Sequence, residues 1–261
     1  MCVFCGRIGV TKQHMWPDWL KKVIPREGTE HMQHITRLDM VQRDLVVIRP
    51  ELLFKRGPIG AKKIRKVCGP CNNGWMSTLE GVAKHTLTTM ITGNHISLNR
   101  EMQTAVAAWT IMTAIVAEYT DVPTQAIPPA DRKLLMQGNL PNGSWRIWIG
   151  KYEGTEWKPQ RYRHAGMSAV LNWGHWPLTR PLPNTQSSTF VMGSLLIIAM
   201  SSAAISPEKF PVPDGAHESL IQIWPPQNDT TEWPPSKVIN DNEATSISNT
   251  LMCKFMPDNT P

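Results

Sequence analysis

The chain has 261 residues, of which 41% are hydrophobic and 18% charged, a composition typical of a globular protein with a sizeable core. No apolar run is long enough for a membrane span and residues 1–30 lack a secretory signal pattern, so we expect a cytoplasmic protein with no membrane partner. A net charge of +6, from 27 Lys and Arg against 21 Asp and Glu, favours a polyanionic partner.

Two CxxC pairs stand out in the first part of the chain. Cys2 and Cys5 form the first pair, and Cys68 and Cys71 form the second. Four thiolates can converge on one structural Zn²⁺, because a two-residue spacer lets a tight turn point both sulfurs the same way. Two chance pairs, or a redox dithiol, are the alternatives. The long gap predicts an insertion or a two-stranded excursion between the pairs, over residues 22–66.

A basic stretch, FKRGPIGAKKIRKVCG, leads into the second pair. It holds six cations and no acid: Lys55, Arg56, Lys62, Lys63, Arg65 and Lys66. On a strand that runs into the zinc site, these side chains would contact nucleic-acid phosphates, positioning a backbone without reading its sequence. A solvated basic strand edge is the alternative.

The segment after the second pair predicts a helix. Ser77 and Glu80 have the spacing of a capping box, and the helix would run from Ser77 to about Met90. We expect a first domain, a zinc-stabilised module, over residues 1–95.

Residues 96–261 are expected to form a second, α+β domain. Apolar residues at spacings of three and four predict a long helix over 99–119, and a short helix follows from Pro129 to about Gln137. Apolar runs between 144 and 224 predict an antiparallel sheet packed on the long helix, including single strands at 166–174 and 187–200. The polar, Pro-rich tail holds one further short helix, over 241–254.

The ordered set of motifs near the N-terminus resembles the HNH, or ββα-metal, endonucleases, in particular their four-cysteine, endonuclease VII-like branch. The resemblance rests on the first CxxC pair, on Gln13-His14 with Pro17 behind them, and on a second CxxC pair followed at once by Asn72. It covers roughly residues 1–90. It implies a treble-clef-like ββα-metal fold in which zinc holds two strands against a helix, and phosphodiester hydrolysis in DNA with a separate Mg²⁺ or Mn²⁺.

Carried over by position, the resemblance makes His14 the general base that deprotonates the attacking water, which suits an imidazole with a pKa of about 6.5. Gln13 and Asn72 take the places of the two metal ligands, and Glu80 is a possible additional ligand. The family usually has Asp or Glu where this chain has Gln13, and a hard cation gains affinity from anionic oxygen. The site would therefore bind its catalytic ion weakly.

Three functions follow from these patterns. The leading hypothesis is a metal-dependent HNH endonuclease that cuts DNA; cutting both strands with one site per chain would favour a homodimer. The second is a zinc-containing module that binds nucleic acid without cutting, because the acid at position 13 is missing. The third is a zinc-stabilised scaffold that binds protein through its C-terminal sheet.

Overall fold

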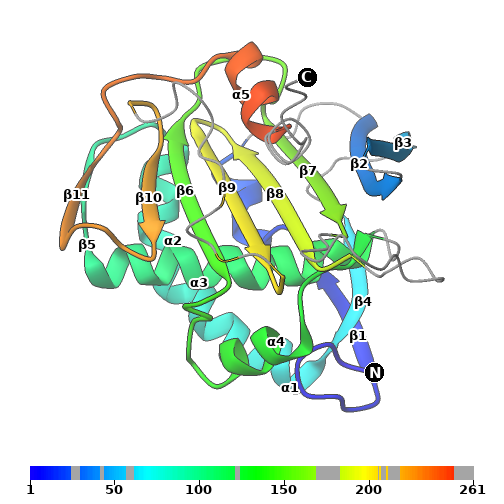
Figure 1. Cartoon of the computed structure of the whole chain (residues 1–261). Helices are drawn as coiled ribbons and strands as arrows, with labels where there is room; N and C mark the ends of the chain where they lie inside the picture. The colour runs from blue at the N-terminus through cyan, green and yellow to red at the C-terminus, as the bar shows by residue number, and fades with distance from the viewer. Residues whose placement is uncertain are drawn as a thin grey trace.

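The structure is a computed structural model, and it has the mixed α+β architecture that the sequence predicts, with helices packed against an antiparallel sheet (Figure 1). For residues 30–41 and 44–56 it describes the backbone alone. The described residues are 1–24, 30–41, 44–56, 62–120, 124–168, 183–204, 206, 210 and 218–249.

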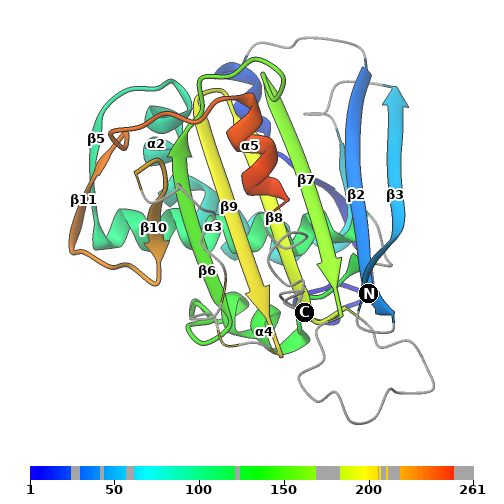
Figure 2. The ribbon, with the colours of Figure 1, turned by 45° about the horizontal axis from the view of Figure 1, so that its top comes forward.

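The central sheet has the strand order β10-β6-β9-β8-β7-β2-β3 (Figures 1 and 2). Its first five strands pair in antiparallel fashion throughout. In chain order they are β6 (Trp145–Lys151), β7 (Gln160–Met167), β8 (Thr185–Met192), β9 (Leu195–Ser202) and β10 (Ile221–Trp224).

Two strands from the N-terminal half extend this sheet. Strand β2 (Glu30–Val41) pairs parallel with β7, and β3 (Asp44–Arg56) pairs antiparallel with β2 at the sheet edge (Figure 2). These two strands are the two-stranded excursion predicted between the CxxC pairs.

Helices cover both faces of the sheet. The long helix α3 (Arg100–Ala117) crosses one face and is buried almost continuously from Val106 onward, which confirms the predicted buried helix. The Asn99 side chain begins it by accepting a hydrogen bond from the Met102 N–H. A 3-10 turn, η4 (Glu118–Thr120), ends it. The short helix α4 (Pro129–Met136) follows.

The opposite face carries α5 (Asp241–Ser248), which shares a second hydrophobic cluster with strands β6, β8 and β9. This helix lies within the range predicted for it. The polar tail also contains β11 (Thr230–Trp233), which pairs with β5 (Ile96–Asn99) and which the sequence analysis missed.

The predicted single strand over 187–200 is wrong. It is a hairpin made of β8 and β9, because the chain reverses at Gly193, whose φ of +54 lies in the left-handed region that favours glycine. Of the strand expected at 166–174, the first residues belong to the end of β7, and residues 169–174 lie outside the described residues.

The N-terminal part forms a two-stranded ribbon joined to a helix. Strand β1 (Val10–His14) pairs antiparallel with β4 (Lys63–Cys68), and a 3-10 turn, η1 (Asp18–Lys22), follows β1. Helix α1 (Gly69–Cys71), a π-type turn (Asn72–Met76) and α2 (Ser77–Ile91) continue from β4. The predicted cap at Ser77 is wrong, because the chain is already helical at Met76 and no side chain caps α2 there.

One hydrophobic cluster contains residues of both predicted domains, whose boundary at 95/96 stays a prediction. Trp16, two residues after the end of β1, is fully buried and contacts Phe190 of β8 edge-to-face, with 5.8 Å between the ring centroids. This contact packs the segment that follows β1 against the central sheet. Within the described residues, no helix is both long and apolar enough to cross a bilayer.

Candidate metal centre and nuclease site

The four cysteines of the two CxxC pairs converge, as predicted. Their sulfur atoms all lie within 4.8 Å of one another, and none of the four is in a disulfide. A tetrahedral zinc with Zn–S distances of about 2.3 Å would place its sulfurs roughly 3.8 Å apart. The Sγ atoms of Cys5 and Cys68 are 3.5 Å apart, so the donor set fits a structural zinc ion.

Tight turns and strand pairing bring the sulfurs together. In the first pair, the Gly6 N–H donates to the Cys2 carbonyl oxygen at 3.0 Å, and Gly6 has a φ of +73. The Val3 N–H donates to the Lys66 carbonyl oxygen at 2.9 Å, which fastens the first turn to β4. Cys68 ends β4, and α1 delivers Cys71 one turn later.

The local electrostatics favour a cation at this cluster. Burial raises the pKa of the Cys71 thiol above its ordinary value. At Cys2 burial acts in the same direction, but backbone hydrogen bonds, the largest from Cys5, lower the pKa to about 7. A buried group of four thiols cannot hold several negative charges alone, so full deprotonation requires a bound metal ion.

His14 is the last residue of β1 and lies on the outer face of the ribbon. It pairs in register with the exposed Lys63, and its side chain is 26% exposed. Its Nε2 is 3.9 Å from Oδ1 of Asp18, which also contacts Lys21. Burial, then the charges of Lys63 and Lys21, lower the pKa of His14, so the imidazole is neutral at neutral pH.

The other three predicted site residues lie around the start of the helix and on the inner face of the ribbon. Gln13 is 7% exposed and pairs in register with the buried Ile64, so it faces away from the side that carries His14. Asn72 is half-buried at the end of α1. Glu80 lies in the first turn of α2, where burial raises its pKa to about 6.

The structure does not gather these residues into a cluster of ionisable ligands. In the described part of the chain, the four cysteines are the one group of three or more His, Cys, Asp or Glu side chains close enough to share an ion.

The predicted basic residues divide into two kinds. Lys63 and Arg65 are exposed on β4, beside His14, whereas Lys66 is half-buried. Lys62 is half-buried just before β4, and its carbonyl oxygen accepts from the Met15 N–H. The side chains of Lys55 and Arg56, in β3, lie outside what the structure describes.

The sequence analysis missed two cations near His14. Lys12 is exposed on β1, and Lys21 on η1 contributes to the charge around the imidazole. Both lie before the dense basic stretch on which the prediction rested. Lys21 reaches this region because η1 follows β1, and Lys63 reaches it through the β1–β4 register.

A cavity of about 840 Å³ lies between α2, α3 and α4. Trp75 forms one wall and also meets Phe4 edge-to-face, with 4.9 Å between ring centroids. Most of the lining is apolar, and Arg100 and Glu101 are its charged residues.

Comparisons with known proteins found no match to the chain among family models, curated proteins or solved structures. Its functional interpretation therefore rests on the residues and on the geometry described above.

Proposed function

We propose that the protein is an HNH-type endonuclease that hydrolyses phosphodiester bonds in DNA, with a structural zinc ion held by Cys2, Cys5, Cys68 and Cys71. The observation that supports it most strongly is the order and pairing of the N-terminal elements. A CxxC turn, a strand that ends in His14, its antiparallel partner β4, a second CxxC turn and a helix occur in this order, with β2 and β3 inserted before β4 and all four sulfurs together. This is the arrangement that the resemblance implies.

In this proposal His14 is the general base. It is accessible on the outer face of the ribbon, next to Lys63 and Arg65, which would hold the phosphate backbone of DNA. The amide oxygens of Gln13 and Asn72 would hold Mg²⁺ or Mn²⁺, with the Glu80 carboxylate as an additional ligand. A bound divalent ion would stabilise the negative charge that develops on the phosphate and on the leaving oxygen.

The decisive experiment incubates the purified, zinc-loaded chain with supercoiled plasmid and Mg²⁺ or Mn²⁺. We expect His14→Ala to lower nicking by about 100-fold or more, because general bases contribute at least that much. His85→Ala is the matched control, since His85 is exposed on α2 and far along the helix from the ribbon. Gln13→Asp should preserve or increase nicking. Equal activity in wild type and His14→Ala would refute the assignment.

A nucleic-acid-binding module that does not cut is the second candidate, and the neutral amide of Gln13 favours it. A salt titration of DNA binding separates both nucleic-acid functions from a protein-binding scaffold. We expect affinity to fall steeply with salt, and Lys63→Gln to reduce the log–log slope by about 1. Lys133→Gln, an exposed change on α4, is the control. A slope near zero for the wild type would point to the scaffold.

A further inference from the structure

We infer that Tyr119 and Arg132 brace strand β4 through Lys66 and thereby keep the four-cysteine cluster in the form that retains its metal. The inference rests on the proposed zinc site but not on DNA cleavage. It gives the Lys66 side chain a positioning role in place of the phosphate contact predicted from sequence.

Two cations meet the ring of Tyr119. Lys66 Nζ lies 5.3 Å from the ring centroid, and the guanidinium carbon of Arg132 lies 5.2 Å from it. Both distances are within the range at which a ring attracts a cation. Tyr119 is in η4, immediately after the long buried helix, so the contact joins the ribbon to the part of the fold that packs on the sheet.

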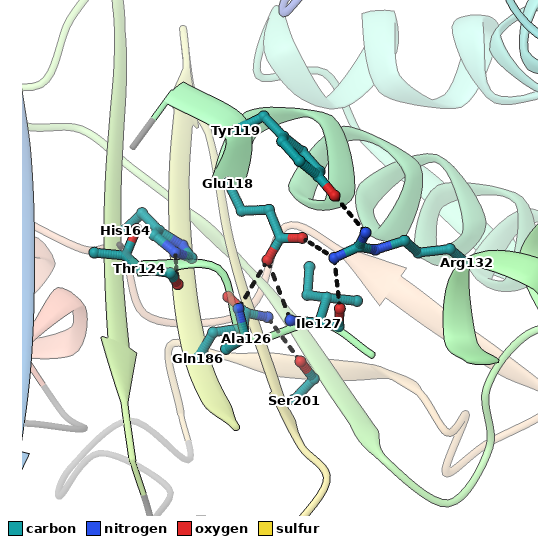
Figure 3. Close-up of polar contacts among 9 residues, drawn as sticks. All are labelled: Glu118, Tyr119, Thr124, Ala126, Ile127, Arg132, His164, Gln186 and Ser201. Carbon is teal, nitrogen blue, oxygen red and sulfur yellow. Dashed lines mark hydrogen bonds and ion pairs between the residues drawn. The ribbon is translucent and has the colours of Figure 1, made fainter. Parts of the chain in front are cut away.

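Arg132 is itself held firmly (Figure 3). Its guanidinium donates to Oε1 of Glu118 at 2.8 Å, to the Ile127 carbonyl oxygen at 2.7 Å and to the Tyr119 hydroxyl. Glu118 is fully buried, and its other oxygen accepts from the N–H groups of Ala126 and Ile127, each at 3.1 Å. Both oxygens of Glu118 and both terminal nitrogens of Arg132 are hydrogen-bonded, whereas the buried Nε of Arg132 has no partner among the described residues. The pair resists displacement, because separating the partners would leave a buried charge unpaired.

Lys66 connects this assembly to the metal-binding turns in two ways. Its carbonyl oxygen accepts the hydrogen bond from Val3 in the first turn, and Cys68 follows two residues later on the same strand. Lys63 and Arg65 are exposed instead. A movement of Lys66 would therefore shift both turns, whereas a change at Lys63 would leave them in place.

The test measures how fast the zinc-loaded full chain loses its metal to an excess of chromogenic chelator, with no DNA present. We expect Lys66→Met to release zinc roughly tenfold faster than the wild type, the size of effect that the loss of one cation–π contact can produce. Lys63→Met is the matched control, with the same substitution on the same strand. Its rate should stay within about twofold of wild type, because the exposed Lys63 side chain makes no cation–π contact with any ring that the structure describes.

Two further variants separate a positioning role from general damage. Lys66→Arg keeps a cation over the ring and should restore slow release. Tyr119→Leu should release zinc at least as fast as Lys66→Met, and combining the two should add little, because both remove the same contact. Thermal unfolding identifies any variant that fails to fold. If Tyr119→Leu fails to fold, the comparison of Lys66→Met, Lys66→Arg and Lys63→Met tests the brace by itself.

The outcomes are distinct from those of the nuclease proposal. Equal release rates for Lys66→Met and wild type, or for Lys66→Met and Lys63→Met, would overturn the brace even if the wild type cuts DNA. The expected order of rates in a chain that never nicks plasmid would support the brace and count against the nuclease.

Discussion

The ribbon and the central sheet achieve order by different means. Every residue of β8 and β9 is buried, and the sheet holds its shape through apolar contact on both faces. Strand β1, by contrast, buries only Gln13 fully. A two-stranded ribbon with one strand so exposed is marginal on its own, so four thiols and a few anchors to the sheet must supply what the ribbon's own core lacks.

This difference in burial determines which region presents reactive side chains to solvent. The side chains of β8 and β9 are all buried, and among the polar groups of the sheet His164 is hydrogen-bonded to the Ser188 hydroxyl and to the Thr124 carbonyl oxygen. The ribbon instead displays His14, Lys63 and Arg65 on its outer face. The buried layer thus supports the accessible face that carries the candidate site.

Removing one of the four sulfurs should have the largest effect, because it should destabilise the ribbon and leave the sheet intact. Cys71→Ser should abolish stoichiometric zinc binding and expose β1 and β4 to hydrogen exchange, because structural zinc sites contribute on the order of 10 kcal/mol to folding. Strands β8 and β9 should keep their protection. Hydrogen exchange measured by mass spectrometry reports the protection of the ribbon and of the sheet separately, and a metal assay reports the zinc content.

The control for this variant is Cys253→Ser, which removes the one cysteine that belongs to neither CxxC pair. It should leave zinc content unchanged. If Cys71→Ser removed protection from β8 and β9 to the same extent as from β1, the two regions would form one cooperative unit and the comparison would be wrong.

The parts of the fold that local sequence encodes were predictable. The CxxC spacings indicated the sulfur cluster, and apolar spacing indicated α3. The pairing of β2 with β7 was not predictable, because it joins segments more than a hundred residues apart, and no local pattern specifies a partner strand. The hairpin at Gly193 was missed because apolar residues continue on both sides of the turn.

The candidate site shows the same limit. Residue types indicated His14 and the basic stretch, but the proposed role of Lys66 depends on Tyr119, which belongs to the predicted second domain rather than to the ribbon. The exposed positions of Lys63 and Arg65 follow from the β1–β4 register. Long-range partners, more than residue types, determine which of the predicted cations remain accessible.

The buried His164 of the sheet predicts a pH dependence of stability. Burial lowers the pKa of His164 from 6.5 to about 4. An unfolded chain takes up this proton near pH 6.5 and the folded chain does not, so stability is complete above pH 6.5 and falls on acidification toward pH 4. The loss amounts to about 3 kcal/mol, at roughly 1.4 kcal/mol for each pKa unit.

Denaturant unfolding of wild type and His164→Gln across this pH range measures the effect. The variant starts from a lower stability, because it loses hydrogen bonds, but its free energy of unfolding should change less with pH. His85→Gln, at an exposed position, should retain the wild-type slope. Parallel pH profiles for all three proteins would show that His164 does not carry the dependence.

The smallest expected effect tests the junction between the two regions, where the β8–β9 turn meets the end of α2. The Ser194 N–H donates to the Ile91 carbonyl oxygen at 2.9 Å, and a Cβ on Gly193 would lie 2.5 Å from that same oxygen. Gly193→Ala should therefore cost about 2 kcal/mol, from backbone strain at positive φ and from overpacking. Gly138 has a φ of +82 but open space around its Cβ position, so Gly138→Ala isolates the strain alone, at about 1 kcal/mol.

Because α2 carries Glu80 and continues from the metal-binding turn, the excess cost at Gly193 should coincide with faster hydrogen exchange in the last turn of α2. Equal costs at the two glycines would mean that the turn gives way and that α2 is not locked against the sheet.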